Sequence, residues 1–138
     1  MKKWFFMSAL ALTTLAAHAG EPKITVYHDP GCGCCTGWVQ YMQQAGFDVT
    51  SVKTSQIALY KQKYGVPQAL ASCHTAVADS SGQVIEGHVP VAAIKKMLAK
   101  PGVRGISAPG MPMNSPGMGE LDGNLVTVDF QGRPFSRD

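Results

Sequence analysis

The stretch ITVYHDPGCGCCTGW, residues 24–38, changes from a strand pattern to a helix pattern around a group of cysteines. Residues 24–28 are β-branched or aromatic and lead into Asp29-Pro30-Gly31, which predicts a strand that ends in a turn. Thr36 then begins a helical spacing of apolar residues that stops at Gly46. We therefore expect the cysteines to lie between the end of a strand and the start of a helix.

The cysteine triplet, Cys32, Cys34 and Cys35, is too crowded for conventional structural disulfides. Neighbouring Cα atoms lie about 3.8 Å apart, whereas a relaxed disulfide needs roughly 4.4 to 6.8 Å, so Cys32 to Cys35 is the one easy bridge. This C-x-x-C spacing is typical of a dithiol redox site, with Cys32 and Cys35 as the catalytic pair. The additional Cys34 indicates instead a thiolate cluster for a soft metal, and an incidental cluster is a third interpretation.

Strand-like and helix-like runs alternate through the rest of the chain. After the first helix the predicted elements are strand 47–52, helix 54–65, strands 74–78 and 83–86, and helix 90–98. Two successive strand–helix units imply a right-handed crossover and parallel pairing of their strands. The order β-α-β-α-β-β-α predicts an α/β, thioredoxin-like domain, with a mixed sheet of four to five strands and three helices. In such a domain the active site lies at the first strand-to-helix junction, where the C-x-x-C spacing occurs.

An irregular segment rich in proline, glycine and serine follows at residues 101–123. Long irregular segments in small domains are usually functional or disordered, and this one presents Met111, Met113 and Met118. Thioethers are soft ligands that suit Cu(I). The alternative is a loop packed over the domain with its methionines as apolar pegs. Residues 125–130 then alternate in polarity and predict a last strand at an edge of the sheet.

Two further segments carry candidate ligands. Cys73 and His74 stand together at the start of the third predicted strand, and His88 precedes the third helix. In a thioredoxin-like arrangement the chain entering the third strand passes beside the cysteine loop, so Cys73 is expected as a fourth sulfur near the triplet. His74 and His88 are candidate ligands beside it, although a buried histidine is more often a satisfied core residue. His28, at the end of the first strand, is a weaker candidate of the same kind.

The chain begins with the pattern of a secretory signal at residues 1–19. Lys2-Lys3 precedes an apolar run over residues 4–17, and small residues at 17–19 suit an export peptidase. The run is too short for a membrane span, and an uncleaved anchor is the alternative. Cleavage leaves residues 20–138 as one domain and removes both lysines, so the formal charge falls from +3 to +1.

The mature chain has no basic patch of the nucleic-acid type, and no membrane partner is expected after cleavage. The helical lysines are predicted to lie on solvated faces: Lys61, Lys63, Lys95, Lys96 and Lys100. Export by such a signal suggests a bacterial periplasm, where unprotected dithiols tend to be oxidised. A cysteine cluster there must be a disulfide, be bound to metal, or be kept reduced.

The choice of metal follows from the types of ligand. Zinc accepts four cysteines but gives no reason for a methionine-rich loop. A preassembled iron–sulfur cluster also takes cysteines, yet it is difficult to reconcile with export of an unfolded chain. Cu(I) suits thiolates, thioethers and imidazoles together, and bridging thiolates would let a few cysteines hold more than one copper ion.

Four ordered motifs resemble the CopG-type periplasmic copper-resistance proteins, a family long described as a domain of unknown function. The motifs are Cys32-Gly33-Cys34-Cys35, Cys73-His74-Thr75-Ala76, Glu86-Gly87-His88-Val89-Pro90, and Pro109-Gly110-Met111-Pro112 with Ser115-Pro116-Gly117-Met118. The resemblance covers nearly the whole mature chain. It implies a thioredoxin-like fold, a sulfur-rich site for one or more copper ions, and interconversion of Cu(I) and Cu(II).

The resemblance also implies which residues bind the metal. It carries over Cys32, Cys34, Cys35, Cys73 and His88, together with Met111 and Met118, as copper ligands. Asn114 stands where the family is expected to have glycine, and Met113 falls at a variable position.

We thus predict a periplasmic protein that holds Cu(I) on its cysteines and contributes to copper resistance. The alternative is a thiol–disulfide oxidoreductase with Cys32 as nucleophile and Cys35 as resolving thiol. A third hypothesis is a carrier that docks with another periplasmic copper-handling protein through residues 101–123.

Overall fold

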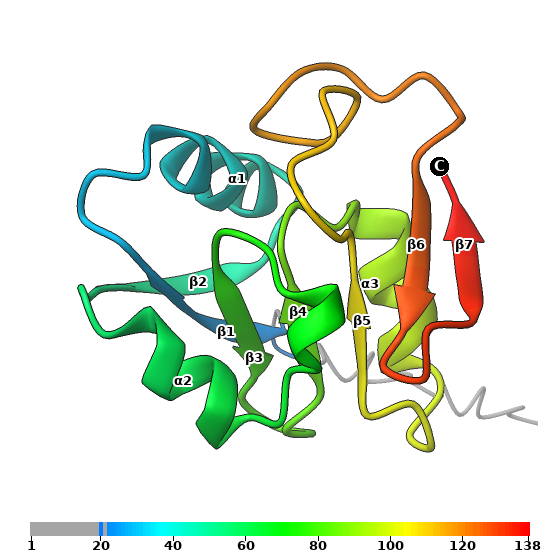
Figure 1. Cartoon of the computed structure of the whole chain (residues 1–138). Coiled ribbons are helices and arrows are strands. Elements are labelled where there is room, and N and C mark those ends of the chain that lie inside the picture. The colour runs from blue at the N-terminus through cyan, green and yellow to red at the C-terminus, as the bar shows by residue number, and fades with distance from the viewer. Residues whose placement is uncertain (1–19, 21) are drawn as a thin grey trace, which may run out of the picture.

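The computed structural model describes residue 20 and residues 22–138 (Figure 1). The predicted signal at residues 1–19 lies outside this part of the chain. Within the described part, no helix has the length and apolar character that a membrane crossing requires.

One seven-stranded mixed sheet forms the centre of the domain. Its strands are β1 Lys23–His28, β2 Asp48–Lys53, β3 Thr75–Ala78, β4 Val84–Glu86, β5 Gly105–Ser107, β6 Val126–Asp129 and β7 Pro134–Arg137. They lie in the order β2-β1-β3-β4-β5-β6-β7. β1 pairs parallel to β2, and β4 pairs parallel to β5. The remaining neighbours are antiparallel.

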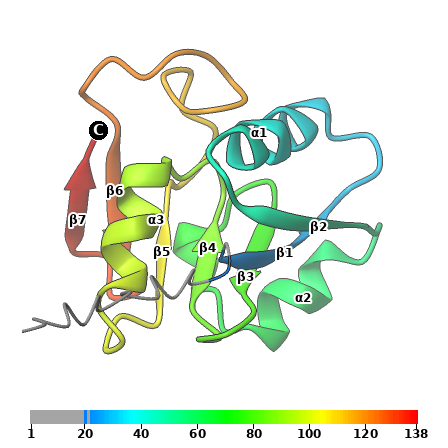
Figure 2. The same ribbon diagram turned by 180° about the vertical axis from the view of Figure 1, so that it is seen from behind.

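Three α-helices cover the sheet: α1 Gly33–Gln44, α2 Ile57–Lys63 and α3 Val91–Leu98, with a short 3-10 helix, η1, at Gln68–Leu70. Alternation along β1 explains the layers, because successive side chains of a strand point to opposite faces. Val26 joins the core that α1 and α3 cover. Tyr27, the next residue, stacks on Tyr60 of α2 with 4.0 Å between ring centroids. Accordingly, α1 and α2 lie on opposite sides of β1 and β2 in both views (Figures 1 and 2).

Two hydrogen bonds join the helices that share this core. The indole Nε1 of Trp38 on α1 donates to the carbonyl oxygen of Val89 at 2.9 Å. The backbone N–H of Val91, at the start of α3, donates to the Tyr41 hydroxyl at 3.0 Å. Buried polar groups of this kind need partners, and here the partners fix α1 beside the turn that carries His88.

The predicted order of elements through α3 is confirmed, as is a mixed α/β domain with three helices. The predicted strand count of four to five is wrong, because the sheet has seven strands. β5 lies inside the segment expected to be irregular, and its sequence Gly-Ile-Ser is too short to show a period. β7 begins at Pro134 and takes the edge position that was expected for β6. Neither strand has a polarity pattern that predicts it, and each forms by pairing with a neighbouring strand.

The first helix begins earlier than predicted, at Gly33 rather than Thr36. Cys32 is its N-cap, and the sulfur of Cys32 accepts a hydrogen bond from the backbone N–H of Cys35 at 3.3 Å. Helix N-termini leave N–H groups without intrahelical partners, and here a sulfur replaces the usual cap oxygen. Consequently Cys34 and Cys35 lie in the first turn of α1 rather than in a preceding loop.

Candidate metal centre

The cysteine triplet lies at the N-terminus of α1, where backbone N–H groups and the helix dipole favour negative charge. Cys32 and Cys35, with Cα atoms 5.3 Å apart, form a disulfide. This is the one easy bridge expected from the sequence. Cys34 is a free thiol whose Sγ lies 3.4 Å from the Sγ of Cys32.

Cys73 joins the triplet because β1 and β3 are antiparallel neighbours. Their register pairs Tyr27 near the end of β1 with Thr75 at the start of β3. The chain entering β3 therefore passes beside the chain leaving β1. The sulfur atoms of all four cysteines lie within 4.8 Å of one another. Free Cys73 is thus a fourth sulfur at the triplet, as the sequence predicted.

His88 is oriented by a backbone carbonyl. Its Nδ1 lies 2.6 Å from the carbonyl oxygen of Pro116, and its Nε2 lies 2.9 Å from the Sγ of Cys73. A carbonyl oxygen only accepts, so Nδ1 carries a proton and donates it. Burial lowers the pKa of His88, against the opposing effect of the Pro116 carbonyl. In the neutral ring, the lone pair of Nε2 therefore faces Cys73, which is the geometry of a metal-ligating histidine.

His74 is fully buried beside the same sulfur. Its Nδ1 lies 3.6 Å from the Sγ of Cys73, and its ring packs against Trp38 and His88. Burial, followed by the neighbouring His88, lowers the pKa of His74 well below its usual value, so the ring is neutral. Its Nε2 has no hydrogen-bond partner among the described residues. Cys73, His74 and His88 form a second group whose ligand atoms lie within 4.8 Å of one another.

His28 has a structural role instead. Its Nδ1 lies 3.0 Å from the carbonyl oxygen of Asp29, and its Nε2 lies 2.6 Å from the hydroxyl of Ser51. Both ring nitrogens are therefore occupied, and His28 is a satisfied core residue.

The methionine loop, residues 108–118, closes against the cysteines through its backbone. A Cβ atom on Gly117, which has φ +87°, would lie 2.7 Å from the Cys34 carbonyl oxygen, 2.8 Å from the Trp38 nitrogen and 3.1 Å from Nδ1 of His88. Figures 1 and 2 show the loop beside α1 at one end of the sheet.

The methionine side chains of the loop differ in exposure. Met111 and Met113 are 50% and 71% exposed, so their side chains face solvent. Met118 is half-buried and follows Gly117 directly. The loop is held beside the site by the close approach of Gly117 to α1 and by the Pro116 carbonyl, which accepts from Nδ1 of His88.

Glu86 and Lys61 are polar groups of the site that sequence analysis missed. Lys61 was expected on a solvated helix face, but its side chain is 17% exposed and pairs with fully buried Glu86. Burial raises the pKa of Glu86, while Lys61 and the hydrogen bonds from Ser72 and Thr75 oppose that rise. The sequence of β4 could have indicated this pair. Its other residues are apolar, as in a strand buried on both faces, and a buried glutamate requires a partner.

Electrostatic conditions at Cys73 favour the protonated thiol in the metal-free protein. Burial, and then the neighbouring Cys34 thiol, raises the pKa of Cys73 to about 11. A thiol must lose its proton to bind a metal. A metal at this position would therefore displace a proton, and its binding would weaken as the pH falls.

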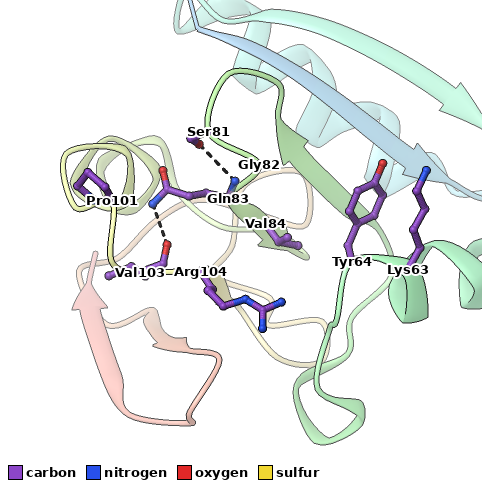
Figure 3. Close-up of a pocket in the computed structure, with 9 residues that line it drawn as sticks. All are labelled: Lys63, Tyr64, Ser81, Gly82, Gln83, Val84, Pro101, Val103 and Arg104. Carbon is purple, nitrogen blue, oxygen red and sulfur yellow. Dashed lines mark hydrogen bonds between the residues drawn. The ribbon is translucent and has the colours of Figure 1, made fainter.

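A cavity of about 330 Å³ lies at the other end of the β3–β4 hairpin (Figure 3). Gln83, Lys63 and Arg104 are among the residues that line it, and its lining includes no cysteine, histidine or methionine. The ligand types for a soft metal are therefore gathered at the cysteine end of the sheet and not in this cavity.

The close approach of Gly117 to α1 can be tested by replacing it with alanine. Gly117→Ala should cost about 2 kcal/mol more folding stability than a Gly123→Ala control, because overpacking adds to the backbone strain. Gly123 also has positive φ (+80°), but a Cβ there would meet no atom within 4 Å. Urea unfolding of both variants provides the measurement. Equal losses would show that the loop does not rest on α1.

Comparison with known proteins gives a consistent picture. Residues 70–118 match the family described as "Protein of unknown function, DUF411". No curated protein matches the chain. Two solved structures, described as copper resistance protein CopG form 1 and form 2, are 36% and 35% identical, with TM-scores of 0.73 and 0.74. Each comparison covers 86% of this chain and 98% of the other. The chain belongs to the CopG-type copper-resistance family.

Proposed function

We propose that this protein holds Cu(I) on Cys32, Cys34, Cys35 and Cys73 and contributes to copper resistance. The observation that carries the proposal is the convergence of these four sulfur atoms, from two distant segments, within 4.8 Å of one another. Thiolates are soft ligands that select Cu(I). The family relationship supports copper over other soft metals.

The neighbouring nitrogen and thioether groups complete the proposed ligand set. His88 directs Nε2 at the Sγ of Cys73, and His74 has its Nδ1 3.6 Å from the same sulfur. Met118 and Met111 supply thioethers from the methionine loop, Met118 from a half-buried position next to Gly117 in the chain and Met111 from a half-exposed position. With several donors around bridging thiolates, the site has room for more than one copper ion.

The domain is thioredoxin-like in this proposal. The strand order β2-β1-β3-β4, with β1 parallel to β2 and antiparallel to β3, supports that description. Strands β5 to β7 then extend the sheet beyond β4. The triplet stands at the first strand-to-helix junction, which is where such a fold keeps its reactive cysteines.

The protein works in the periplasm, after removal of residues 1–19. The exported state is consistent with the Cys32–Cys35 disulfide, because disulfides persist in oxidising compartments. The two remaining thiols, Cys34 and Cys73, are those that a bound metal would protect from oxidation.

The Cys32–Cys35 pair couples copper binding to copper redox chemistry. In the reduced protein, two thiols provide two electrons, one for each of two Cu(II) ions. The products are two Cu(I) ions, the Cys32–Cys35 disulfide and two protons. The thiols that are not bridged, Cys34 and Cys73, then remain available to hold Cu(I) beside the newly formed disulfide.

Metal analysis tests the copper-binding proposal. Protein recovered from the periplasm of copper-treated cells should contain more copper than zinc, and Cys35→Ser should lose most of it because the cluster loses a sulfur. Met42→Leu serves as control, since it removes a buried core sulfur at small cost. X-ray absorption should show sulfur coordination. Stoichiometric zinc, or no metal, in the wild-type protein would contradict the proposal.

A thiol–disulfide oxidoreductase is the second candidate function. It is favoured by the disulfide between a half-buried Cys32 and a buried Cys35, which suits an accessible nucleophile and a resolving thiol. With dithiothreitol as the reductant, the metal-free protein should then catalyse the reduction of insulin, and Cys32→Ser should abolish the reaction. Cys34→Ser, which preserves the C-x-x-C pair, is the control. Inertness of the wild-type protein both towards insulin and in the refolding of a scrambled protein would eliminate this candidate.

A partner protein that exchanges copper would dock at the methionine loop. Met111 and Met113 expose their thioethers there, and Leu121 in the following segment is 40% exposed. Thioethers bind Cu(I) without forming disulfides, which suits transfer to another periplasmic copper-handling protein.

A further inference from the structure

The carboxylate of Glu86, at the end of β4, is completely buried and fully hydrogen-bonded. Its Oε1 accepts from the backbone N–H of Ser72 at 2.7 Å and from the ammonium group of Lys61. Its Oε2 accepts from the Thr75 hydroxyl at 2.7 Å. Lys61 Nζ also donates to that hydroxyl at 3.1 Å. One carboxylate therefore joins α2, the chain that enters β3, and β3 itself.

Glu86 connects the segment that supplies Cys73 to its own segment, which supplies His88. The N–H that its Oε1 accepts belongs to Ser72, which directly precedes Cys73. His88 follows Glu86 by two positions and meets the Sγ of Cys73 through Nε2. The segments also approach closely at Gly87, whose N–H donates to the His74 carbonyl oxygen at 3.0 Å. The carboxylate thus fixes one segment relative to the other.

Ser72 extends the same connection to the methionine loop. Its hydroxyl donates to the carbonyl oxygen of Gly110, and the two residues form an isolated parallel bridge. An added Cβ on Gly87 would lie 2.4 Å from the Ser72 hydroxyl oxygen, so the Ser72 side chain packs directly on Gly87. The Glu86 carboxylate, which accepts from the Ser72 amide, therefore helps to position both Cys73 and the methionine loop.

Stability alone is a weak explanation for this arrangement. Desolvation of two charges can exceed their attraction, and apolar pairs of similar volume often replace buried ion pairs without loss of stability. The carboxylate differs from an apolar side chain because its Oε1 accepts a hydrogen bond from the Ser72 amide. A methyl or methylene group cannot accept that bond.

We infer that Glu86 is a positioning residue for the metal centre: by accepting from the Ser72 amide, it holds Cys73 against the cysteine triplet and His88. Lys61 supplies the counter-charge to the buried carboxylate. The expected effect of Glu86 on copper affinity rests on the proposed copper-binding function. The placement of Cys73 can be measured without copper.

Two double variants separate the hydrogen bond from the charge pair. Lys61→Met/Glu86→Met removes both charges and leaves the Ser72 amide without an acceptor. Lys61→Met/Glu86→Gln also removes both charges, but the amide oxygen can still accept from Ser72 while the amide N–H donates to the Thr75 hydroxyl. Neither variant buries an uncompensated charge, so both are expected to fold. Urea unfolding of each variant records any difference in stability.

The first measurement is iodoacetamide labelling of Cys73 in metal-free protein with the Cys32–Cys35 disulfide intact. Cys34 in the same molecule is the internal reference, and peptide mass spectrometry distinguishes the two thiols. Lys61→Met/Glu86→Met should raise the Cys73 to Cys34 labelling ratio about tenfold, because loss of the acceptor for the Ser72 amide favours opening of this segment. Lys61→Met/Glu86→Gln should remain within about twofold of wild type, since its amide oxygen restores the bond.

The second measurement is competition for Cu(I) against bicinchoninate. The methionine double variant should bind Cu(I) about tenfold more weakly than wild type, as loss of outer-shell partners does at other metal sites. The glutamine double variant should match wild type. Equal labelling ratios and equal affinities in the two variants would overturn the role of Glu86 and leave the copper function intact. Absence of copper binding in wild type would overturn the proposed function, and labelling alone would then decide the role of Glu86.

Discussion

The antiparallel pairing of β1 with β3 is the constraint on which the candidate metal centre depends. Its register sets Thr75 opposite Tyr27, so the chain that carries Cys73 enters the sheet where the chain that carries the triplet leaves it. Sites supported by strands and helices are held more accurately than sites built on loops. Four sulfurs from distant parts of the sequence can therefore converge within 4.8 Å without a ligand to gather them.

Around these sulfurs, most buried polar atoms have a definite partner. The Pro116 carbonyl fixes the ring of His88, and Glu86 satisfies the Ser72 amide. Among the described residues, two buried side-chain polar atoms have no hydrogen-bond partner, Nε2 of His74 and Oε1 of Gln83. Gln83 lies at the cavity at the other end of the hairpin. The other nitrogen of His74, Nδ1, is the one that lies near a sulfur, 3.6 Å from the Sγ of Cys73.

The disulfide determines how many sulfur ligands the site offers. When Cys32 and Cys35 are bridged, Cys34 and Cys73 are the free thiols, with the imidazole of His88 in contact with the latter. Reduction of one bond doubles the number of thiols within the same small volume. The proposed copper binding and the proposed thiol redox chemistry would therefore use the same group of atoms, which explains why the sequence favoured both interpretations.

The sequence by itself determined the local features: the strand before the triplet, the order of elements through α3, and the spacing that permits one disulfide. Each depends on neighbours in the chain, as does the family resemblance carried by the four motifs. Only the tertiary structure decided the length of the sheet, because the short β5 and the polar β7 exist through pairing with other strands. It also decided the burial of Lys61, since a charged side chain on a helix reveals its partner only when Glu86 is brought beneath it. Long-range contacts leave no period in a sequence, and this site is made of them.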